Sequence, residues 1–329
     1  MRRIKWGIMG TGTIASKFAT ALNSMDHIEL EGVASRDLGR AQDFAKRFHF
    51  HKAYGSYEEL AEDPSIDVIY IATPHPEHKG NARLCIKNKK SVLCEKPFTL
   101  NKEESQYLIA LAKEHEVFLM EAMWTKFLPV TAMVKQWIDE KKIGKVKYLR
   151  ASFGFQTKFD EKHRLFDPQK AGGALLDVGI YPLAYAIHML GSLPEQVVSN
   201  AVIGRSMVDE QNVISLRFKE GILADLSSAI TAETGNEALI VGDQGKILVP
   251  YFWMAEKAQR YSLDGELLET FSVPFLANGY EYEAEEVNKC IREGRLESDI
   301  HTLSDTLNII TLMDQIREQW GLKYPQELN

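Results

Sequence analysis

The chain has 329 residues, 45% of them hydrophobic and 26% charged, so it is long enough to fold as a globular protein of two domains. Its formal net charge of −7, without any basic block, argues against nucleic acid or an anionic membrane as a partner. No run approaches the ~20 apolar residues of a membrane span. The three cysteines form no C-x-x-C pair, so we expect no disulfide framework and no zinc knuckle, and a reducing cytoplasm as the compartment.

The first part of the chain alternates short apolar runs with helical patterns, which indicates a parallel sheet built from strand–helix–strand units. The expected strands are 4–9, 28–35, 67–73, 91–95 and 117–122. The expected helices are 14–25, 39–48, 57–63, 78–89 and 102–115. The strands are almost continuously apolar, as is typical when helices cover both faces of a sheet. We therefore predict an α/β fold in which residues 1–123 form a doubly wound first domain.

After Trp124 the pattern changes to that of an α+β domain, which we assign to residues 124–329. Two helices are expected first, at 127–142 and 173–190, and Pro182 must lie in the first turn of the second helix or kink it. Strands separated by glycines follow, which predicts a large open sheet that is mostly antiparallel. One strand, 148–156, is expected between these two helices, the other strands are expected at 198–204, 213–218, 222–230, 238–242, 245–249 and 260–271, and two further helices at 281–294 and 303–320.

The first strand runs into a glycine-rich turn that opens the first helix. Gly10, Gly12 and Ala15 fit the G-x-G-x-x-[GA] pattern in which a tight turn brings a pyrophosphate to the start of a helix. A glycine turn without a ligand is the alternative, but the strand–turn–helix context favours a dinucleotide. The residues expected to contact the phosphates are Gly10, Thr11, Gly12, Thr13 and Ile14.

The end of the second strand decides between the two nicotinamide cofactors. The chain reads Ser35-Arg36-Asp37 there, and a hydroxyl and a guanidinium suit the 2′-phosphate of NADP. Asp37 would instead favour NAD, unless it caps the helix that starts near Leu38. We therefore expect NADP rather than NAD.

Polar residues also follow the next two strands of the sheet. Thr73 ends the strand at 67–73, and Pro74, His75 and His78 follow it; all four are expected to line the nicotinamide side, although His78 also suits a helix start. The two histidines lack a carboxylate cluster, so we expect no metal. Glu95 and Lys96 emerge at the same carboxyl edge, where Pro97 stops the strand. The alternative interpretation is that Glu95 and Lys96 form a surface ion pair.

The helix at 173–190 carries a second set of chemical groups. Asp177 and Tyr181 are four residues apart and share one face, and a charged Asp amid apolar residues must be paired or functional. The Lys96 ammonium favours ionisation of a neighbouring phenol, so Lys96 and Tyr181 form a candidate proton-relay pair with Asp177 orienting Lys96 or the substrate. A satisfied Asp and a core Tyr are the structural alternative.

Four stretches, GIMGTGTIA, IATPHPEH, CEKP and GGALLDVGIY, resemble the Gfo/Idh/MocA oxidoreductases in order and approximate spacing. AYGSYEELAEDP, VFLMEAMWTKFLP and the GGALLDVGIYP stretch are most similar to the dimeric dihydrodiol dehydrogenase branch, which includes NADP-dependent D-xylose dehydrogenases. The resemblance covers nearly the whole chain. It implies a Rossmann domain followed by an α+β domain whose open sheet makes a homodimer, and a hydroxylated small-molecule substrate.

The same resemblance assigns roles to individual residues. Lys96 matches the lysine of the EKP motif, Tyr181 the catalytic tyrosine of the branch, and Asp177 the aspartate of the helix. Arg150 matches an arginine near the site. Trp124 and Phe127 are expected to line the substrate pocket, unless they only fill the core.

The predicted function is hydride transfer between NADP and a carbinol carbon of a sugar, cyclic polyol or trans-dihydrodiol, with Tyr181 as acid and base. An inositol or amino- or keto-sugar dehydrogenase of the same fold that uses NAD is one alternative. A non-catalytic, NADP-binding regulatory protein is another.

Overall fold

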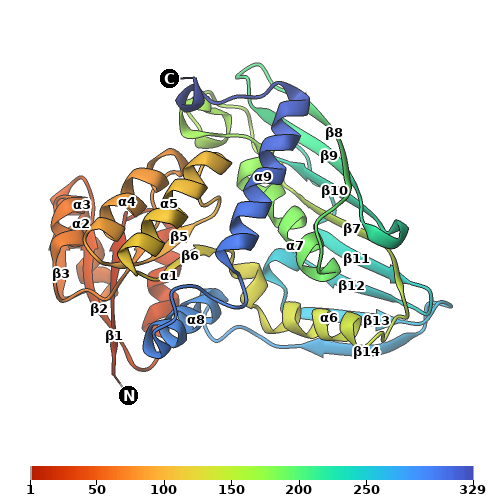
Figure 1. Ribbon diagram of the computed structural model, residues 1–329, viewed down its shortest axis with the longest axis horizontal. Coiled ribbons are helices and arrows are strands. Elements are labelled where there is room, and N and C mark those ends of the chain that lie inside the picture. The colour runs from red at the N-terminus through yellow and green to blue at the C-terminus, as the bar shows by residue number, and fades with distance from the viewer. Residues whose placement is uncertain (1, 329) are drawn as a thin grey trace. The chain divides into compact units, whose positions relative to one another are not determined.

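The computed structural model describes residues 2–328 and divides into two compact units (Figure 1). The first unit runs to Trp124 and also contains Phe275–Ile310. The second contains Thr125–Pro274 and the chain from Thr311 onward. The chain therefore leaves the first unit after Trp124 and returns to it at Phe275. The division of the chain into domains of residues 1–123 and 124–329 stays a prediction.

The first unit is built on a six-stranded parallel sheet of order β3-β2-β1-β4-β5-β6. Its strands are β1 (Ile4–Met9), β2 (Ile28–Ala34), β3 (Lys52–Tyr54), β4 (Val68–Ile71), β5 (Ser91–Glu95) and β6 (Leu119–Ala122). The strand order reverses between β1 and β4, and ligands of open α/β sheets bind beyond the carboxyl ends of the strands at such a point. The predicted α/β class with a Rossmann-type sheet is confirmed.

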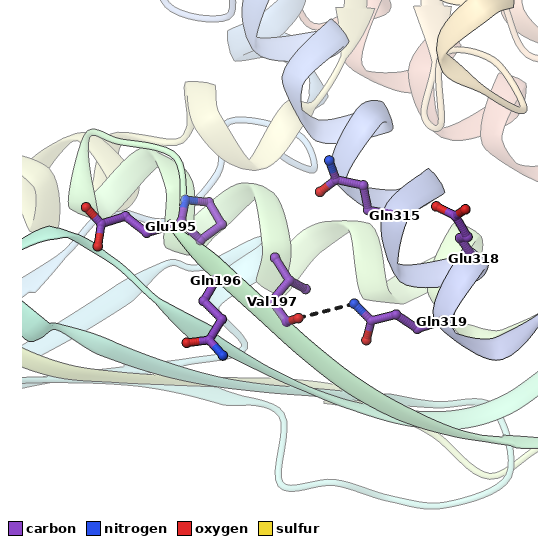
Figure 2. A pocket seen from close by; sticks show the side chains of 7 residues that line it. Glu195, Gln196, Val197, Gln315, Glu318 and Gln319 are labelled. Carbon is purple, nitrogen blue, oxygen red and sulfur yellow. Dashed lines mark hydrogen bonds between the residues drawn. The ribbon is translucent and has the colours of Figure 1, made fainter.

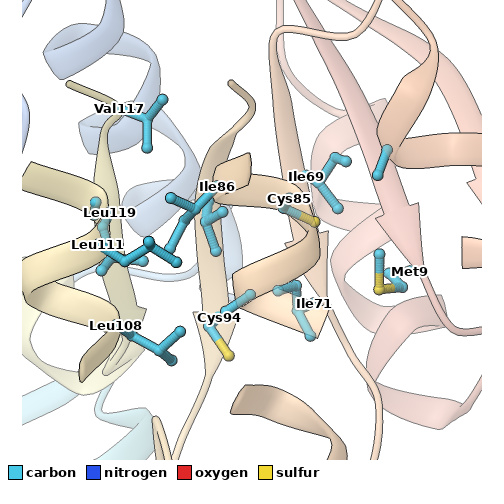
Figure 3. Close-up of a cluster of buried hydrophobic side chains, with 14 of the residues drawn as sticks. Met9, Ile69, Ile71, Cys85, Ile86, Cys94, Leu108, Leu111, Val117 and Leu119 are labelled. Carbon is cyan, nitrogen blue, oxygen red and sulfur yellow. The ribbon is translucent and has the colours of Figure 1, made fainter. Parts of the chain in front are cut away.

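Helices pack on this sheet and bury its apolar side chains. They are α1 (Thr13–Asn23), α2 (Leu38–Phe48), α3 (Tyr57–Glu62), α4 (His78–Lys87), α5 (Lys102–His115) and α8 (Tyr280–Glu293). Figure 3 shows one core cluster, in which Ile69 and Ile71 of β4 meet Ile86 of α4 and Leu108 of α5. Helix α8 returns from far along the chain to this unit, where the indole N–H of Trp6 donates to Asn288 Oδ1 at 3.0 Å.

The second unit is built on an eight-stranded sheet of order β14-β13-β12-β11-β7-β10-β9-β8. Its strands are β7 (Val146–Gly154), β8 (Gln196–Ile203), β9 (Asp209–Arg217), β10 (Leu223–Ala229), β11 (Glu237–Gly242), β12 (Lys246–Pro250), β13 (Lys257–Tyr261) and β14 (Leu267–Ser272). All neighbours pair antiparallel except β7 and β10. The predicted large, mostly antiparallel sheet is confirmed.

Within residues 2–328, helices cover one face of this sheet and no helix covers the other. Helices α6 (Pro129–Asp139) and α7 (Ile180–Leu190) contact the sheet, as Figure 1 shows. On β9 and β10 the buried Ile214 and Leu226 alternate with the half-exposed Val213 and Leu223. The uncovered face of the sheet therefore carries apolar side chains.

The predicted helix at 173–190 has a more complex winding than its sequence indicated. A π-helical turn, Leu175–Gly179, precedes α7, and the amide of Ile180 donates to the carbonyl of Leu175. Pro182 lies in the first turn of α7, as expected, where its missing N–H cannot bond to Val178. Residues 168–190 are apolar and long enough to cross a membrane by length and composition, yet 89% of the most apolar window is buried inside the fold.

A polar cavity of about 490 Å³ lies in the second unit between the start of β8 and helix α9 (Leu303–Trp320). Figure 2 shows its lining, where the side-chain amide of Gln319 donates to the carbonyl of Val197 at 3.2 Å. Glu195 and Glu318 also line it, and none of the site residues predicted from the sequence does. This cavity is therefore separate from the predicted site residues.

Candidate active site

The glycine turn between β1 and α1 requires a glycine at its first position. Gly10 has φ +105°, and its amide donates to the carbonyl of Ala34 at 2.9 Å. A Cβ at Gly10 would lie 3.0 Å from the carbonyl oxygen of Ala72, at the end of β4. The turn therefore passes close to the backbone beside the two central strands, as a phosphate-binding turn does.

The second glycine leaves open space in front of α1. Gly12 is the N-cap of this helix, and no side chain of residues 2–328 caps it. A Cβ at Gly12 would have no neighbouring atom of the described chain within 4 Å. Unpaired amides at a helix start that faces open space suit an anionic group, so this turn fits the pyrophosphate of a dinucleotide.

At the end of β2 the acidic residue has a structural role. Asp37 is the N-cap of α2 and accepts a hydrogen bond from the amide of Arg40 at 3.0 Å, which is the capping role that the sequence left open. Ser35 is buried and its hydroxyl accepts from the amide of Asp37 at 3.4 Å. Arg36 is exposed between them, and its charge acts on the phenol of Tyr57.

His78 joins the ends of two neighbouring strands. Its ring is fully buried, with Nε2 2.8 Å from the carbonyl oxygen of Thr73 and Nδ1 2.9 Å from that of Pro97. Burial lowers the pKa of His78, so the neutral ring donates to one of these carbonyls. The hydroxyl of Thr73 accepts from Asn81 at 3.0 Å. His78 therefore fixes the edge, while Pro74 is exposed there.

The EKP residues lie at the end of β5, as predicted. Lys96 is half-buried, and its amide donates to Glu95 Oε2 at 3.2 Å, while the Lys96–Pro97 peptide is cis. Glu95 is buried and accepts a hydrogen bond from the hydroxyl of Tyr70. Burial raises the pKa of Glu95, against the opposing effect of the Lys96 ammonium. Glu95 is therefore buried at the end of β5 and Lys96 is partly exposed beside it, and their functional role stays a prediction.

A further acid of the same unit was missed by sequence reasoning. Glu283 of α8 is fully buried, and neither of its carboxyl oxygens has a hydrogen-bond partner among the residues that the structure describes. Burial raises the pKa of Glu283 well above its ordinary value, and the negative charge of Glu95 adds to this effect. Burial of Glu283 without a hydrogen-bond partner among the described residues therefore favours its protonated, uncharged form.

Aromatic side chains lie where the chain leaves the first unit. Trp124 stacks on Tyr280 of α8, with ring centroids 4.4 Å apart and an interplanar angle of 3°. Phe127 follows in the second unit and is buried. Their substrate-binding role stays a prediction, and Tyr280 is an addition that the sequence pattern did not indicate.

In the second unit, Asp177 forms an ion pair that holds it in place. Arg164 donates to Asp177 Oδ1 at 2.7 Å and to Oδ2 at 3.3 Å, so both carboxyl oxygens are engaged. Asp177 is buried, whereas Arg164 is more than half exposed. Burial alone would lower the pKa of Arg164, but the carboxylate of Asp177 and the phenol of Tyr181 raise it. Arg164 begins a short 3₁₀ turn, Arg164–Phe166, and was missed because so short a turn carries no periodic signal.

Tyr181 lies against an aromatic wall. Phe153 of β7 is 5.7 Å from its ring centroid and stacks on Trp253 at 3.5 Å, with an interplanar angle of 8°. Tyr181 and Trp253 are both largely buried. Phe153 and Trp253 were not predicted, because each also suits core filling.

Arg150 lies on the face of the sheet opposite to this wall. It alternates along β7 with the buried Leu149 and Ala151, and Phe153 has the same parity as these two. Its guanidinium pairs with Glu237 at 2.6 Å. The structure therefore separates Arg150 from Tyr181, and its proposed place near the site stays a prediction.

The site residues thus form two groups, each within one unit. The glycine turn, Ser35, Arg36, Thr73 and Lys96 belong to the carboxyl edge of the parallel sheet in the first unit. Arg164, Asp177 and Tyr181 belong to the second. Within residues 2–328 there is no group of three or more His, Cys, Asp and Glu side chains that could hold a metal.

This fold, with a glycine turn at its switch point, defines a dinucleotide-binding oxidoreductase class. Residues 4–123 match the model of the oxidoreductase family with an NAD-binding Rossmann fold, and residues 131–248 match the model of the GFO/IDH/MocA C-terminal domain. The chain belongs to the Gfo/Idh/MocA family of oxidoreductases, as the sequence motifs predicted.

Relatives cover almost the whole chain. Trans-1,2-dihydrobenzene-1,2-diol dehydrogenase of Xenopus laevis is 39% identical over 333 residues, which cover 98% of this chain and 99% of the relative. The human protein of the same name is 34% identical, with the same coverage. Among solved structures, a 3-ketoreductase from Actinomadura kijaniata in complex with NADP and TDP-benzene has a TM-score of 0.87 at 24% identity, over 96% of this chain and 98% of its own. That likeness supports the fold.

Proposed function

We propose that this enzyme is an NADP-dependent dehydrogenase that transfers hydride between the cofactor and a carbinol carbon of a trans-dihydrodiol, cyclic polyol or sugar. The observation that carries the proposal is the phenol of Tyr181, which lies beside the Arg164–Asp177 ion pair and against the Phe153–Trp253 stack. An acid–base group next to a fixed charge and an apolar wall suits a hydroxylated ring as substrate.

The proposed roles of the side chains follow from their chemistry. When bound, NADP supplies the acceptor or donor of hydride. During oxidation Tyr181 takes the hydroxyl proton as the carbinol carbon loses its hydride and becomes a carbonyl, and it returns the proton in the reverse direction. In this proposal the ammonium of Lys96 hydrogen-bonds the oxygen of the reacting hydroxyl group and favours the ionised form of the Tyr181 phenol. Arg164 keeps Asp177 oriented and adds positive charge beside Tyr181.

The choice of a dihydrodiol as first substrate rests on the relatives. Those named trans-1,2-dihydrobenzene-1,2-diol dehydrogenase are 33–39% identical over 98% of this chain. The flat faces of Phe153 and Trp253 suit the planar part of such a ring. The choice of NADP rests on Ser35 and Arg36 at the end of β2, with Asp37 engaged as a helix cap.

The test is a spectrophotometric assay of the purified protein. We expect NADPH to form from NADP with trans-1,2-dihydrobenzene-1,2-diol, and D-xylose, D-glucose, inositols and trans-cyclohexanediols serve as competing candidates. Tyr181→Phe should lower kcat at least ~10²-fold with the NADPH Kd little changed, since general acid–base catalysis contributes on that scale. Native turnover in this variant would remove Tyr181 from the mechanism. NADP binding without turnover of any alcohol would favour a regulatory protein.

The uncovered face of the eight-stranded sheet is the proposed homodimer surface. It carries the half-exposed Val198, Val202, Val213 and Leu223 along three neighbouring strands. Exposed apolar side chains gathered on one face of a sheet are typical of an interface between copies. The cytoplasm is the proposed compartment, which agrees with the free and buried thiols of the three cysteines.

A further inference from the structure

The segment before the π turn passes between two parts of the second unit at very close range. Gly173 has φ +117°, and a Cβ there would lie 2.3 Å from Asp209 Oδ1. A Cβ at Gly172 would lie 2.5 Å from the carbonyl oxygen of Leu165, which also accepts from the amide of Gly173 at 2.8 Å. The glycine pair thus fixes the distance between Asp209 and the loop that carries Arg164.

Asp209 holds the beginning of the π turn through one carboxyl oxygen. It is the first residue of β9 and is fully buried. Its Oδ2 accepts from the amide of Leu175 at 2.8 Å and from Asn212 at 2.9 Å, and Ser228 donates to the amide oxygen of Asn212 at 3.0 Å. Its Oδ1 has no hydrogen-bond partner in the described part of the chain.

The C-terminal segment holds the same turn from another side. The hydroxyl of Tyr324 donates to the carbonyl of Gly172 at 2.7 Å and is fully buried. Burial raises the pKa of Asp209 to about 7, and the charged or titratable groups that act on it are Arg317 of α9 and Tyr324. A buried carboxyl group with one unpaired oxygen destabilises the fold, so its presence here calls for a role.

We propose that Asp209 is a positioning residue of the active site. By holding the amide of Leu175, Asp209 keeps the π turn wound. The wound turn places Asp177 against Arg164 and also positions the hydroxyl of Tyr181. The inference rests on the proposed function, because it assigns Asp209 a part in the same chemistry. A π turn is a rare winding that recurs at functional sites, so it needs support from outside the helix.

The winding of the π turn determines the positions of the site residues that follow it. Asp177 and Tyr181 both follow Leu175 along one helix, so a change in winding at Leu175 moves both groups together. Arg164 is tied to the same turn by the bond between Gly173 and Leu165. Loss of the Asp209 carboxyl would leave the buried amide of Leu175 unpaired, and the turn would rewind to satisfy it.

The test compares Asp209→Ala with Asp209→Asn, using trans-1,2-dihydrobenzene-1,2-diol and NADP as probes. We expect the alanine variant to lower kcat ~10-fold or more while KM changes less than ~3-fold, since small misplacements of reacting groups can lower rates by up to ~10²-fold. The NADPH Kd should stay native. The asparagine variant keeps an oxygen that accepts from Leu175, so it should restore kcat to within ~3-fold of the native value.

A matched control separates positioning from stability alone. The hydroxyl of Ser152, on β7, donates to the carbonyl of Thr234 at 2.7 Å and is buried on the opposite side of the sheet from Leu149. Ser152→Ala should lower Tm but keep the native kcat. The proposal fails if Asp209→Ala turns over like the native enzyme, if Asp209→Asn loses as much as the alanine variant, or if Ser152→Ala loses equal activity.

Two further measurements keep the test decisive. If Asp209→Ala does not fold, Tyr324→Phe removes only the hydroxyl that holds Gly172 and should lower kcat ~3-fold or more with the NADPH Kd native. If the native protein oxidises none of the candidate alcohols, the proposed function fails by itself. Hydrogen exchange over residues 172–181 then decides the positioning role: exchange should be faster in Asp209→Ala and native in Asp209→Asn. Native exchange in both variants overturns it.

Discussion

The carboxylate of Asp37 caps α2, and this leaves Arg36 as the side chain beside β2 that suits a phosphate. The identity of an acidic residue at a strand end therefore says less about cofactor choice than its hydrogen bonds do. A capping carboxylate accepts from amides of its own helix, so it has less to offer to a ribose hydroxyl.

The prediction at this position concerns cofactor affinity. Arg36→Ala should raise the Kd of NADPH at least ~10-fold, because a charge-assisted hydrogen bond contributes about 1.5–3 kcal/mol, and should change the Kd of NADH little. Fluorescence titration measures both constants. Arg47→Ala, whose guanidinium lies over Phe48 at the other end of α2, is the matched control and should bind both cofactors like the native protein. Equal weakening of both cofactors by Arg36→Ala would refute the 2′-phosphate role.

Glu283 provides a pH-dependent prediction about stability. Its pKa in the folded protein lies well above the ordinary value of 4.5. As pH rises above 4.5, the carboxyl group of Glu283 loses its proton in the unfolded chain but retains it in the folded chain. The free energy of unfolding therefore falls. Glu283→Gln removes this loss, so the Tm of the variant should exceed the native Tm by an amount that grows as pH rises above 4.5.

Thermal unfolding at several pH values measures the effect. The matched control is Glu285→Gln on the same helix, because Glu285 is exposed and pairs with Arg292 at 3.4 Å, an interaction that contributes little. Its difference from the native Tm should not grow with pH. A difference for Glu283→Gln that stayed constant with pH would mean that Glu283 is ionised in the folded protein.

At the scale of elements, the two glycines of the turn between β1 and α1 serve different purposes. Gly10 is needed by the fold, since it has φ +105° and a close carbonyl neighbour. Gly12 has φ −80°, which any residue adopts, and a Cβ added there would enter open space. Two glycines of one motif therefore answer different physical needs.

A pair of variants tests this difference. Gly10→Ala should lower the free energy of unfolding by about 1–3 kcal/mol through strained backbone, and should weaken NADPH binding as well. Gly12→Ala should leave Tm native and weaken NADPH binding at least ~10-fold, because the added methyl group fills the space that a pyrophosphate needs. Calorimetry and fluorescence titration measure the two effects. Native NADPH affinity in Gly12→Ala would move the phosphate site away from this turn.

Most elements could be predicted from the sequence because their patterns are long and regular. The strands 4–9 and 91–95 and the helices 102–115 and 303–320 have the predicted bounds. β3 was missed, because three residues, Lys52–Tyr54, are too few to show a period. The parallel pairing of β7 with β10 was also missed, since it joins strands far apart in the chain. The π turn leaves no periodic signal that differs from an α-helix.

The site residues could be predicted where they belong to a local sequence motif. The glycine turn, the EKP residues and the Asp177–Tyr181 helix are found from local spacing, and their roles remain predictions. Arg164, Asp209 and Glu283 were not found, because each acquires its meaning from a partner far along the chain or from burial. Such contacts depend on tertiary packing, which the pattern of one segment does not reveal.

At the scale of the whole molecule, the uncovered sheet face predicts the oligomeric state. Val213→Arg should place a charge in the middle of the proposed dimer surface and convert the dimer to a monomer, because an unpaired buried charge is costly. Analytical ultracentrifugation measures the change. Leu276→Arg, at an exposed apolar residue of the first unit, is the control and should stay dimeric. A native protein that sediments as a monomer would disprove the homodimer.

The return of residues 275–310 to the first unit has a consequence for how such genes recombine. The indole of Trp6 depends on Asn288, and Glu121 accepts hydrogen bonds from His301 and Thr306. A single crossover near codon 124 would pair the nucleotide-binding half of one parent with foreign partners for these buried groups. A viable chimera therefore needs two junctions, so that both stretches of the first unit are inherited together.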